Sequence, residues 1–367
     1  MKILAASLFI GMFSTCVPAQ SSVTLYGIVD AGITRTGGGR SSNATGAGTS
    51  AVQAYNGGSA WLLTTGNQNG SRLGFRGVED LGGGTKALFT IEMGIQMDTG
   101  ASDQGGIPFG RQAFVGLETA YGQFLLGRQY SPYWDVIAVL DPFGTGHAPR
   151  IQNEFPAAGY TRVNNALRWN SPNWNGWSSQ AMYAFGEQAG DSRAGESIGL
   201  SMGYGSGPLT AKLVHHRGNT SFVPATAADA KFRSTLAGLT YDFSVVKAFL
   251  AVDTNTTSNI ATGARMQYSR DLMIGAQLPI GAGTVIASYI RRDNRLRASW
   301  DARQYGLGYV HNLSKRTTLY ASIGFIDTEA GSGLKVPNAP PVPSSAQVIN
   351  GADAPKRETT IGIRHAF

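Results

Sequence analysis

Apolar and polar residues alternate with a period of two in many short segments of the chain. The clearest segment is 85–99, where one face carries six apolar side chains: Ala87, Phe89, Ile91, Met93, Ile95 and Met97. The opposite face carries charged and amide side chains: Lys86, Glu92, Gln96 and Asp98. A period of two predicts a β-strand. One apolar and one charged face fit a wall between lipid and a watery interior, because a basic side chain facing lipid costs roughly 2–4 kcal/mol at mid-depth.

Weaker alternation of the same kind predicts further strands. The segments are 23–33, 72–76, 197–204, 236–243, 304–309 and 321–325. The alternation is lost at 110–117 and 284–290, where we expect β-bulges. It returns at 356–367, which ends on the aromatic Phe367 without polar residues to protect a free sheet edge. We therefore predict that this last strand closes a barrel beside the strand at 23–33.

The predicted connections between strands alternate in length. Short clusters of turn-forming residues lie at 82–84, 121–122, 206–208, 281–283 and 314–316. Long connections lie at 37–58, 131–160, 218–229, 255–264 and 330–355. Short turns on one side and long loops on the other are typical of transmembrane β-barrels. Strands of roughly 9–11 residues with such connections favour sixteen strands, although fourteen or eighteen also fit.

Composition supports a membrane barrel and excludes helical membrane spans. Charged residues make up 14% of the chain and glycine 49 of its 367 residues, so the chain is poorer in charge and richer in glycine than typical soluble domains. Beyond the N-terminal region, no segment approaches 18 consecutive apolar residues. A chain in lipid must pair its backbone groups internally, which leaves the closed β-barrel. The prediction is an all-β fold, a transmembrane antiparallel barrel.

The N-terminal segment predicts export. Residues 1–19 contain Lys2, an apolar stretch and a small-residue ending before Gln20, as in a cleaved secretory signal peptide. A lipoprotein signal that uses Cys16 is a weaker alternative. Cleavage would remove the only cysteine and leave one barrel domain, residues 20–367, in the outer membrane of a Gram-negative cell. It would also remove one unit from the formal charge of +7.

Enzyme and cofactor motifs are weak. The five histidines lack metal-ligand spacing, and the adjacent His215 and His216 point to opposite faces of a strand. The GGGTK sequence at 82–86 lacks the spacing of a phosphate-binding loop and fits a tight turn. We expect no catalytic residue, cofactor, metal or nucleic-acid partner, although spacing alone leaves open a Ser-His pair on the outer face of a barrel.

Several segments together resemble the trimeric general porins of the β-proteobacterial type. They are SSVTLYGIVDAG at the start, SRLGFRGVEDLGGGTKALFTIE, GRQAFVGLE, GQFLLGRQYSP, LDPFGTG and the ending GIRHAF. The resemblance runs from about residue 21 to the terminus and is strongest at 70–145. It implies a 16-stranded barrel, a homotrimer, and a third long loop folded into the lumen. It also implies passive diffusion of small hydrophilic solutes and ions. The second long loop, 100–107, is short here, which puts in doubt any trimer latch built from it.

The resemblance makes loop 131–160 the expected constriction loop. Ser131 and Pro132 suit the start of a short helix that the Asp141-Pro142 step would end. The acidic candidates in this loop are Asp135, Asp141 and Glu154. The basic candidates on the wall are Arg72 and Arg76 by alternation, Arg111 and Arg128 by position in the family, and Arg168 by its phase with Asn164 and Asn170. Facing charges of opposite sign would screen solutes by charge and hydration.

Three classes of function remain open. They are a general diffusion porin with mild anion preference, a substrate-specific outer-membrane channel, and an outer-membrane enzyme or adhesin. The net positive charge only mildly favours anions, because whole-chain charge is a poor guide to a local constriction. Expected partners are two further copies of the chain, outer-membrane lipids including lipopolysaccharide, and the barrel-assembly machinery. The resemblance implies that this machinery reads Phe367 as an assembly signal.

Overall fold

The fold is a closed wall of antiparallel strands. The structure, a computed structural model, describes residues 22–37, 59–155, 161–219, 230–296, 301–328 and 356–367. The predicted signal peptide, 1–19, lies outside the described residues, as do residues 156–160 of the predicted constriction loop. Within the described part, no helix is long and apolar enough to cross a membrane.

In the described residues, seventeen strand segments build the wall. They are β1 (Ser22–Gly37), β2 (Ala60–Thr65), β3 (Arg72–Gly82), β4 (Thr85–Gly94), β5 (Gln112–Thr119), β6 (Gly122–Tyr130), β7 (Arg162–Asn170), β8 (Trp177–Ala184), β9 (Ser197–Ser206), β10 (Leu209–Asn219), β11 (Ala230–Asp242), β12 (Lys247–Asn259), β13 (Arg265–Ile280), β14 (Gly283–Asn294), β15 (Ala302–Asn312), β16 (Thr317–Thr328) and β17 (Arg357–Ala366). The helices are α1 (Pro132–Leu140) and the 3₁₀ turns η1 (Gln104–Gly106) and η2 (Ile151–Asn153).

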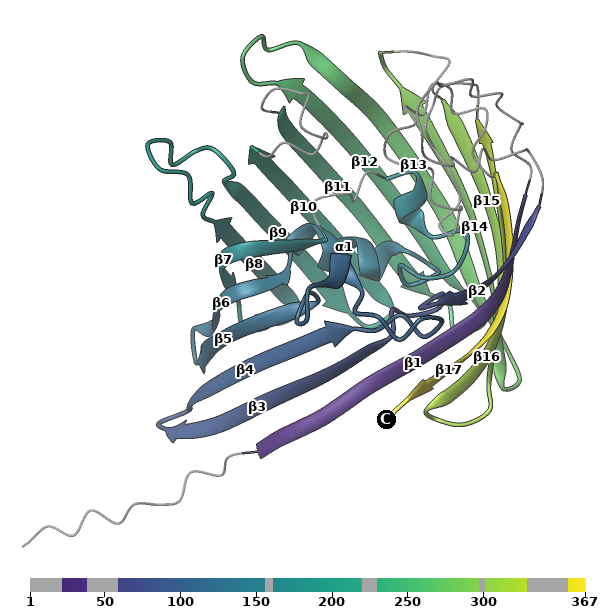
Figure 1. Cartoon of the computed structure of the whole chain (residues 1–367), viewed down its shortest axis with the longest axis horizontal. Helices are drawn as coiled ribbons and strands as arrows, with labels where there is room; N and C mark the ends of the chain where they lie inside the picture. Colours follow the sequence, from purple (N-terminus) through teal and green to yellow (C-terminus); the bar gives the residue numbers. More distant parts are fainter. Residues whose placement is uncertain (1–21, 38–58, 156–160, 220–229, 297–300, 329–355) are drawn as a thin grey trace, which may run out of the picture.

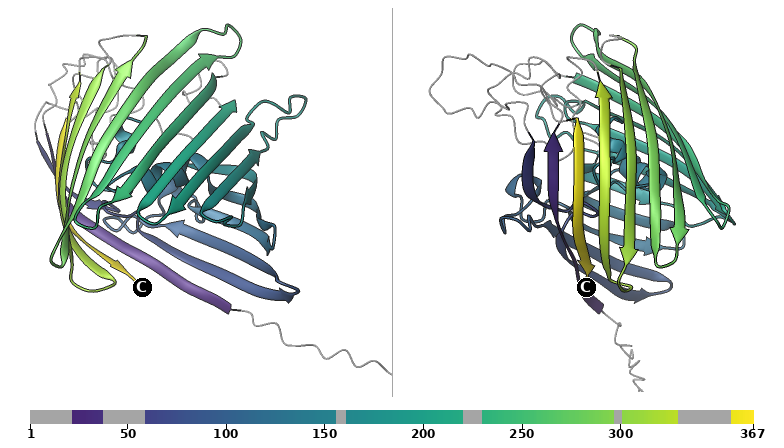
Figure 2. Two further views of the ribbon diagram at one scale, coloured as in Figure 1. Left: turned by 180° about the vertical axis from the view of Figure 1, so that it is seen from behind. Right: turned by 90° about the vertical axis from the view of Figure 1, so that its right-hand side faces the viewer.

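These segments occupy sixteen positions in the barrel, as predicted. β2 and β3 pair with successive halves of β1, so together they form one interrupted strand. The ring closes where β1 pairs with β17 through ten residue pairs, from Ile28↔Ala366 to Gly37↔Arg357. Figure 2 shows these two strands side by side, although they come from opposite ends of the chain. The prediction of a closing strand beside 23–33 is therefore confirmed.

The two faces of the wall have reversed burial compared with a soluble protein. Leu25 and Ile33 on β1 and Leu250 on β12 are exposed outside the barrel, while Asp30 and Thr34 are buried on the inner face. A band of exposed apolar side chains around a polar interior is what a lipid-facing barrel requires. The same inversion recurs in β16, whose exposed positions include Leu319, Ile323 and Phe325.

The third long connection folds inside the barrel and carries α1, as Figure 1 shows. The predicted start of this helix is confirmed, because the Ser131 hydroxyl accepts a hydrogen bond from the Trp134 N–H at 3.1 Å and Pro132 follows as the first helical residue. We call residues 131–155 the constriction loop. Its apolar side chains meet the inner wall in one buried cluster, which contains Tyr133, Val136, Ile137, Leu140, Ile151 and Phe155 of the loop and Val214, Phe232, Leu236, Phe249, Ala251, Met273 and Ile290 of β10–β14.

The buried cluster explains one place where the alternation of apolar and polar residues gives a wrong prediction. No bulge interrupts the pairing of β14 at residues 284–290, nor that of β5 with its neighbours, so both expected bulges are wrong. Ile286 and Ile290 break the alternation because they are apolar on the inner face, where Ile290 is buried against the constriction loop. The strand predicted at 85–99 also ends earlier, at Gly94, and β12 extends to Asn259 into a predicted loop.

The reversed burial predicts how the wall tolerates charge. Leu250→Arg should lower the free energy of unfolding from lipid vesicles by about 2–4 kcal/mol, because the guanidinium would face hydrocarbon. The same substitution at Thr210, on the lumen face of β10, should cost much less. Denaturant titration of both variants in vesicles measures the difference, and equal losses would contradict the assignment of the faces.

Candidate pore constriction

A cavity of about 810 Å³ lies inside the barrel between the constriction loop and the wall. Its lining comes from the end of β2, the start of β3 and the residues between them, from the connection between β4 and β5, from the end of β6, from the constriction loop and from the start of β7. The charged residues among them are Arg72, Arg111, Arg150, Arg162, Asp103 and Asp135. Four cations against two anions make this part of the lumen electropositive.

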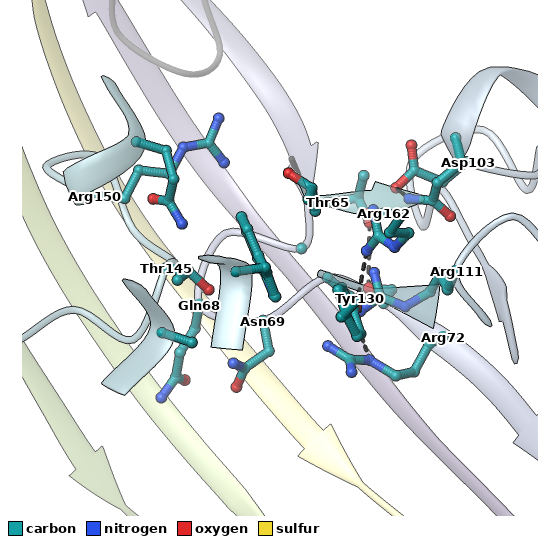
Figure 3. Close-up of a pocket in the computed structure, with 18 of the residues that line it drawn as sticks. Thr65, Gln68, Asn69, Arg72, Asp103, Arg111, Tyr130, Thr145, Arg150 and Arg162 are labelled. Carbon is teal, nitrogen blue, oxygen red and sulfur yellow. Dashed lines mark hydrogen bonds between the residues drawn. The ribbon is translucent and has the colours of Figure 1, made fainter. Parts of the chain in front are cut away.

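Three of the arginines gather around Tyr130, as Figure 3 shows. The Tyr130 hydroxyl accepts hydrogen bonds from the guanidinium groups of Arg111 at 2.7 Å and Arg162 at 2.9 Å. The Arg162 guanidinium also stacks over the Tyr130 ring, 4.7 Å from its centroid. The opposite charge comes from Glu92, which accepts from Arg111 Nε at 2.8 Å and lies 3.8 Å from Arg72. A single buried carboxylate therefore supports two lining arginines.

The ring stack extends from the wall to the constriction loop. Trp134 of α1 stacks on Tyr130 with nearly parallel rings, 5.9 Å between centroids. Tyr130 is thus held by an arginine and a tryptophan while its hydroxyl binds two arginines. This arrangement fixes the guanidinium groups, so they can attract an anion without first reorganising.

Asp135 and Arg168 form an ion pair that ties α1 to β7. Arg168 also donates to the Tyr130 carbonyl at 2.7 Å and to Asn170 Oδ1 at 2.7 Å. Asp135 lines the cavity, whereas Arg168 is buried behind it and is absent from the lining. The two predicted residues, Asp135 and Arg168, are therefore in contact, but only Asp135 is exposed to the cavity.

Asp141 organises the constriction loop from within. Its carboxylate accepts backbone N–H hydrogen bonds from Phe143 at 2.9 Å, Thr145 at 3.0 Å and Ile151 at 3.1 Å. Burial raises the pKa of this carboxyl to about 6, although these three hydrogen bonds and the nearby Arg150 act in the opposite direction. Asp141 is 3% exposed and does not line the cavity. Its carboxylate therefore stabilises the fold of the loop through these hydrogen bonds and does not face the lumen.

Glu154 is also buried rather than exposed to the lumen. Neither of its carboxyl oxygens has a hydrogen-bond partner within the described residues. Burial raises the pKa of Glu154, Arg292 acts in the opposite direction and Asp271 adds to the increase, so that the pKa is about 8. The Arg292 guanidinium instead donates to the Glu154 backbone carbonyl at 2.8 Å.

The remaining predicted arginines, Arg76 and Arg128, are not part of the cavity lining. Arg76 stacks over the Tyr26 ring at 5.4 Å, further along β3 toward its short turn. Arg128 donates to the Gly110 carbonyl at 2.8 Å and to the Asn164 side chain. Of the eight residues predicted for the constriction, the cavity is lined by Arg72, Arg111 and Asp135.

Sequence reasoning missed several lining residues. Arg150 lies in the constriction loop, where no alternation gives direction, Arg162 is the first residue of β7, and Asp103 lies in the short second loop. Tyr130 could have been considered, because it is the last residue of a strand directly before the loop.

Comparisons with known proteins agree on one family. A family profile described as "Gram-negative porin" matches residues 5–331. The chain is 34% identical to outer membrane porin protein 32 of Delftia acidovorans over 95% of each chain. It is 32% identical to an outer membrane porin protein of Bordetella pertussis, over 87% of this chain and 92% of that protein.

A solved structure gives the same result. The anion-selective porin from Comamonas acidovorans superposes with a TM-score of 0.77 at 31% identity, and the match covers 95% of this chain and all of that one. Both the sequence and the fold of the chain are therefore similar to outer-membrane porins.

The burial of Glu154 predicts a pH-dependent stability. In the unfolded chain its carboxyl ionises near the ordinary value of 4.5, whereas in the folded chain its pKa is about 8. Between these values the folded chain binds more protons, so the free energy of unfolding should fall as the pH rises from 4.5 to about 8. Glu154→Gln should flatten this part of the curve in denaturant titrations of the detergent-solubilised protein. Glu79→Gln, at an exposed position of β3, is the control, and equal slopes in the two variants would refute the assignment.

Proposed function

Because the chain belongs to the Gram-negative porin family, we propose that its barrel is a passive diffusion channel for small hydrophilic solutes and ions, with a preference for anions. The barrel lies in the bacterial outer membrane. The observation that carries the anion preference is the charge of the lumen cavity, in which four arginines outnumber two aspartates. The anion selectivity named for the similar Comamonas structure supports the same proposal.

The predicted constriction residues take distinct roles in this proposal. Arg72, Arg150 and Arg162, which are partly exposed, would meet a passing anion and replace part of its hydration shell, and Arg111, which is 4% exposed, would add its charge at the cavity wall. Their mutual repulsion is limited because Glu92 neutralises part of the charge from behind the lining.

The other candidates support the passage. Arg168 would hold Asp135 and α1 in place, Asp141 and Glu154 would shape the constriction loop, and Arg76 and Arg128 would extend the positive potential beside the cavity. This assignment rests on the ion pair of Arg168, on the backbone hydrogen bonds of Asp141 and on the exposure of each side chain.

The relatives are channels rather than enzymes, and we propose that this chain has no enzymatic activity. The described residues do contain a Ser-His pair, with Ser197 Oγ 2.8 Å from His216 Nε2. Both side chains are buried and the His216 ring stacks on Phe232, so a substrate has no access to them. A substrate-specific channel is the remaining alternative, and saturation of the current by one solute would favour it.

For partners we propose a homotrimer and contact with lipopolysaccharide. The trimer rests on membership of the porin family. The lipid contact rests on exposed basic residues, Arg291 of β14 and Arg303 of β15, which are direct neighbours across the two strands. Two residues away from these arginines on each strand, Tyr289 and Tyr305 are also direct neighbours, with 5.3 Å between their ring centroids. Guanidinium groups above an aromatic belt suit phosphate groups at the membrane surface.

Neutralising lining arginines should weaken anion preference. We expect the double variant Arg72→Gln and Arg162→Gln to lower the ratio of anion to cation permeability by up to roughly thirtyfold, since each of the two lining charges contributes about 1 kcal/mol at contact distance in water. Reversal potentials in a potassium chloride gradient measure the ratio. Arg233→Gln, on an exposed position of β11, should leave it unchanged, and an unchanged ratio in the double variant would remove these arginines from the ion path.

Deleting Phe367 should impair assembly more than conduction. We propose that the barrel-assembly machinery recognises this residue, which in the folded barrel exchanges two backbone hydrogen bonds with Gly27 at 3.1 Å. The truncated chain should reach the outer membrane in reduced amount, while the single-channel conductance of assembled copies stays close to that of the full chain. Phe367→Tyr is the control that keeps an aromatic ring. Normal membrane levels of the truncated chain would argue against the signal.

A further inference from the structure

The barrel wall is interrupted beside the cavity. β1 pairs with β2 up to Ala31↔Thr65, and with β3 from Ile28↔Arg72 onward. Only two β1 residues separate these pairs, whereas the other strand has six, residues 66–71. We call residues 66–71 the inward turn. It has four more residues than a continuous strand would need, and Gln68, Asn69 and Gly70 of this surplus line the cavity.

Asp30 of β1 fixes the inward turn to the wall. One carboxylate oxygen accepts the backbone N–H groups of Gln68 at 2.8 Å and Asn69 at 2.7 Å. The other accepts the Tyr320 hydroxyl of β16 at 2.6 Å. Asp30 is 1% exposed, so its hydrogen bonds face little competition from water. The Asp30 backbone is paired as well, because its carbonyl accepts the Gly66 N–H at 2.9 Å and its N–H donates to the Ser71 hydroxyl at 3.0 Å. The carboxylate thus binds the N–H groups of the turn that have left the ladder.

The opposite side of the inward turn meets the constriction loop. The Asn67 carbonyl accepts a hydrogen bond from the His147 backbone N–H. Gly146 lies so close to the Gln68 carbonyl that an added Cβ would collide with it. The turn and the loop therefore contact each other through their backbones, and the loop can approach this closely because residue 146 lacks a side chain.

The inward turn also holds the two wall arginines. Arg72 Nε donates to the Gly70 carbonyl at 2.9 Å. A Cβ added to Gly70 would lie 2.7 Å from a terminal nitrogen of Arg111. The Arg111 guanidinium thus rests directly on the turn, while its other nitrogens bind Glu92 and Tyr130.

We infer that the inward turn is a second constriction element, built from the barrel wall itself, which positions Arg72 and Arg111 and seats the constriction loop. The inference rests on the proposed channel function and adds a specificity-determining segment to it. The channel is narrowed from two sides: the constriction loop supplies Asp135 and Arg150, and the inward turn supplies neutral amides and the support for two arginines. The length of the insertion, rather than the charge of its side chains, sets how far the wall protrudes.

The register gives a direct test of this inference. Deleting residues 67–70 leaves two residues between β2 and β3, the number that continuous pairing with β1 requires. The barrel should still close, while the lumen widens and both arginines lose their support. We expect the single-channel conductance to rise roughly twofold or more and the reversal potential to move toward zero, because a wider and less charged passage discriminates less.

A milder variant keeps the test informative if the deletion prevents folding. Gly70→Ala leaves the turn in place but must displace the Arg111 guanidinium. It should reduce anion preference with a smaller change in conductance. Gly205→Ala on β9 is the matched control, because no heavy atom lies within 4 Å of its added Cβ, and it should behave like the unmodified chain.

The outcomes separate the two proposals. Heat-modifiable migration in gels establishes that each variant has folded. If the unmodified protein gives no ion current in planar bilayers, the channel function itself fails. If it conducts, and Gly70→Ala keeps its conductance and reversal potential, as does the deletion variant wherever that variant folds, then the inward turn is ordinary wall and the inference is overturned.

Discussion

Closure of the backbone hydrogen-bond ladder is the constraint on which the rest of this structure depends. In hydrocarbon an unpaired N–H or C=O group costs several kcal/mol, so every strand needs a partner on both sides. β1 meets this requirement by pairing with β17 along one edge and with β2 and β3 along the other. The last residue completes the ring through its hydrogen bonds to Gly27. Once the wall is closed, its inner face is free to carry polar and irregular structure.

The inner face of the barrel has two sides of different character, one apolar and one charged. On the side of β10–β14 it is apolar and packs against α1, so the constriction loop has a hydrophobic core of its own inside the barrel. On the side of β1–β6 it is polar and charged, and Glu92, Tyr130 and the arginines form one connected set of hydrogen bonds. The apolar side fixes the loop, and the fixed loop determines which charges remain exposed to the lumen.

The sequence could predict the wall because a period of two is a local property. Strand alternation, turn clusters and the strand around Phe367 all follow from it, and the Ser131 helix start follows from local capping chemistry. The period failed at Ile290, where an inward apolar residue packs against a loop that is distant in sequence. Arg72 and Arg76 share one face of β3, yet only Arg72 lies at the height of the constriction loop. Alternation gives a side chain its face, but its depth relative to the loop depends on tertiary folding.

The apolar cluster beneath α1 also gives the passage an uneven outline. Because it fills the space between the loop and β10–β14, the lumen cavity lies to one side, against β2, β3 and β6. A solute in the proposed channel would therefore pass nearer to β2, β3 and β6 than to β10–β14, between the arginines of the wall and the residues of α1 that line the cavity. Such a passage would expose a solute to charge mainly from one side of the barrel rather than from all around it.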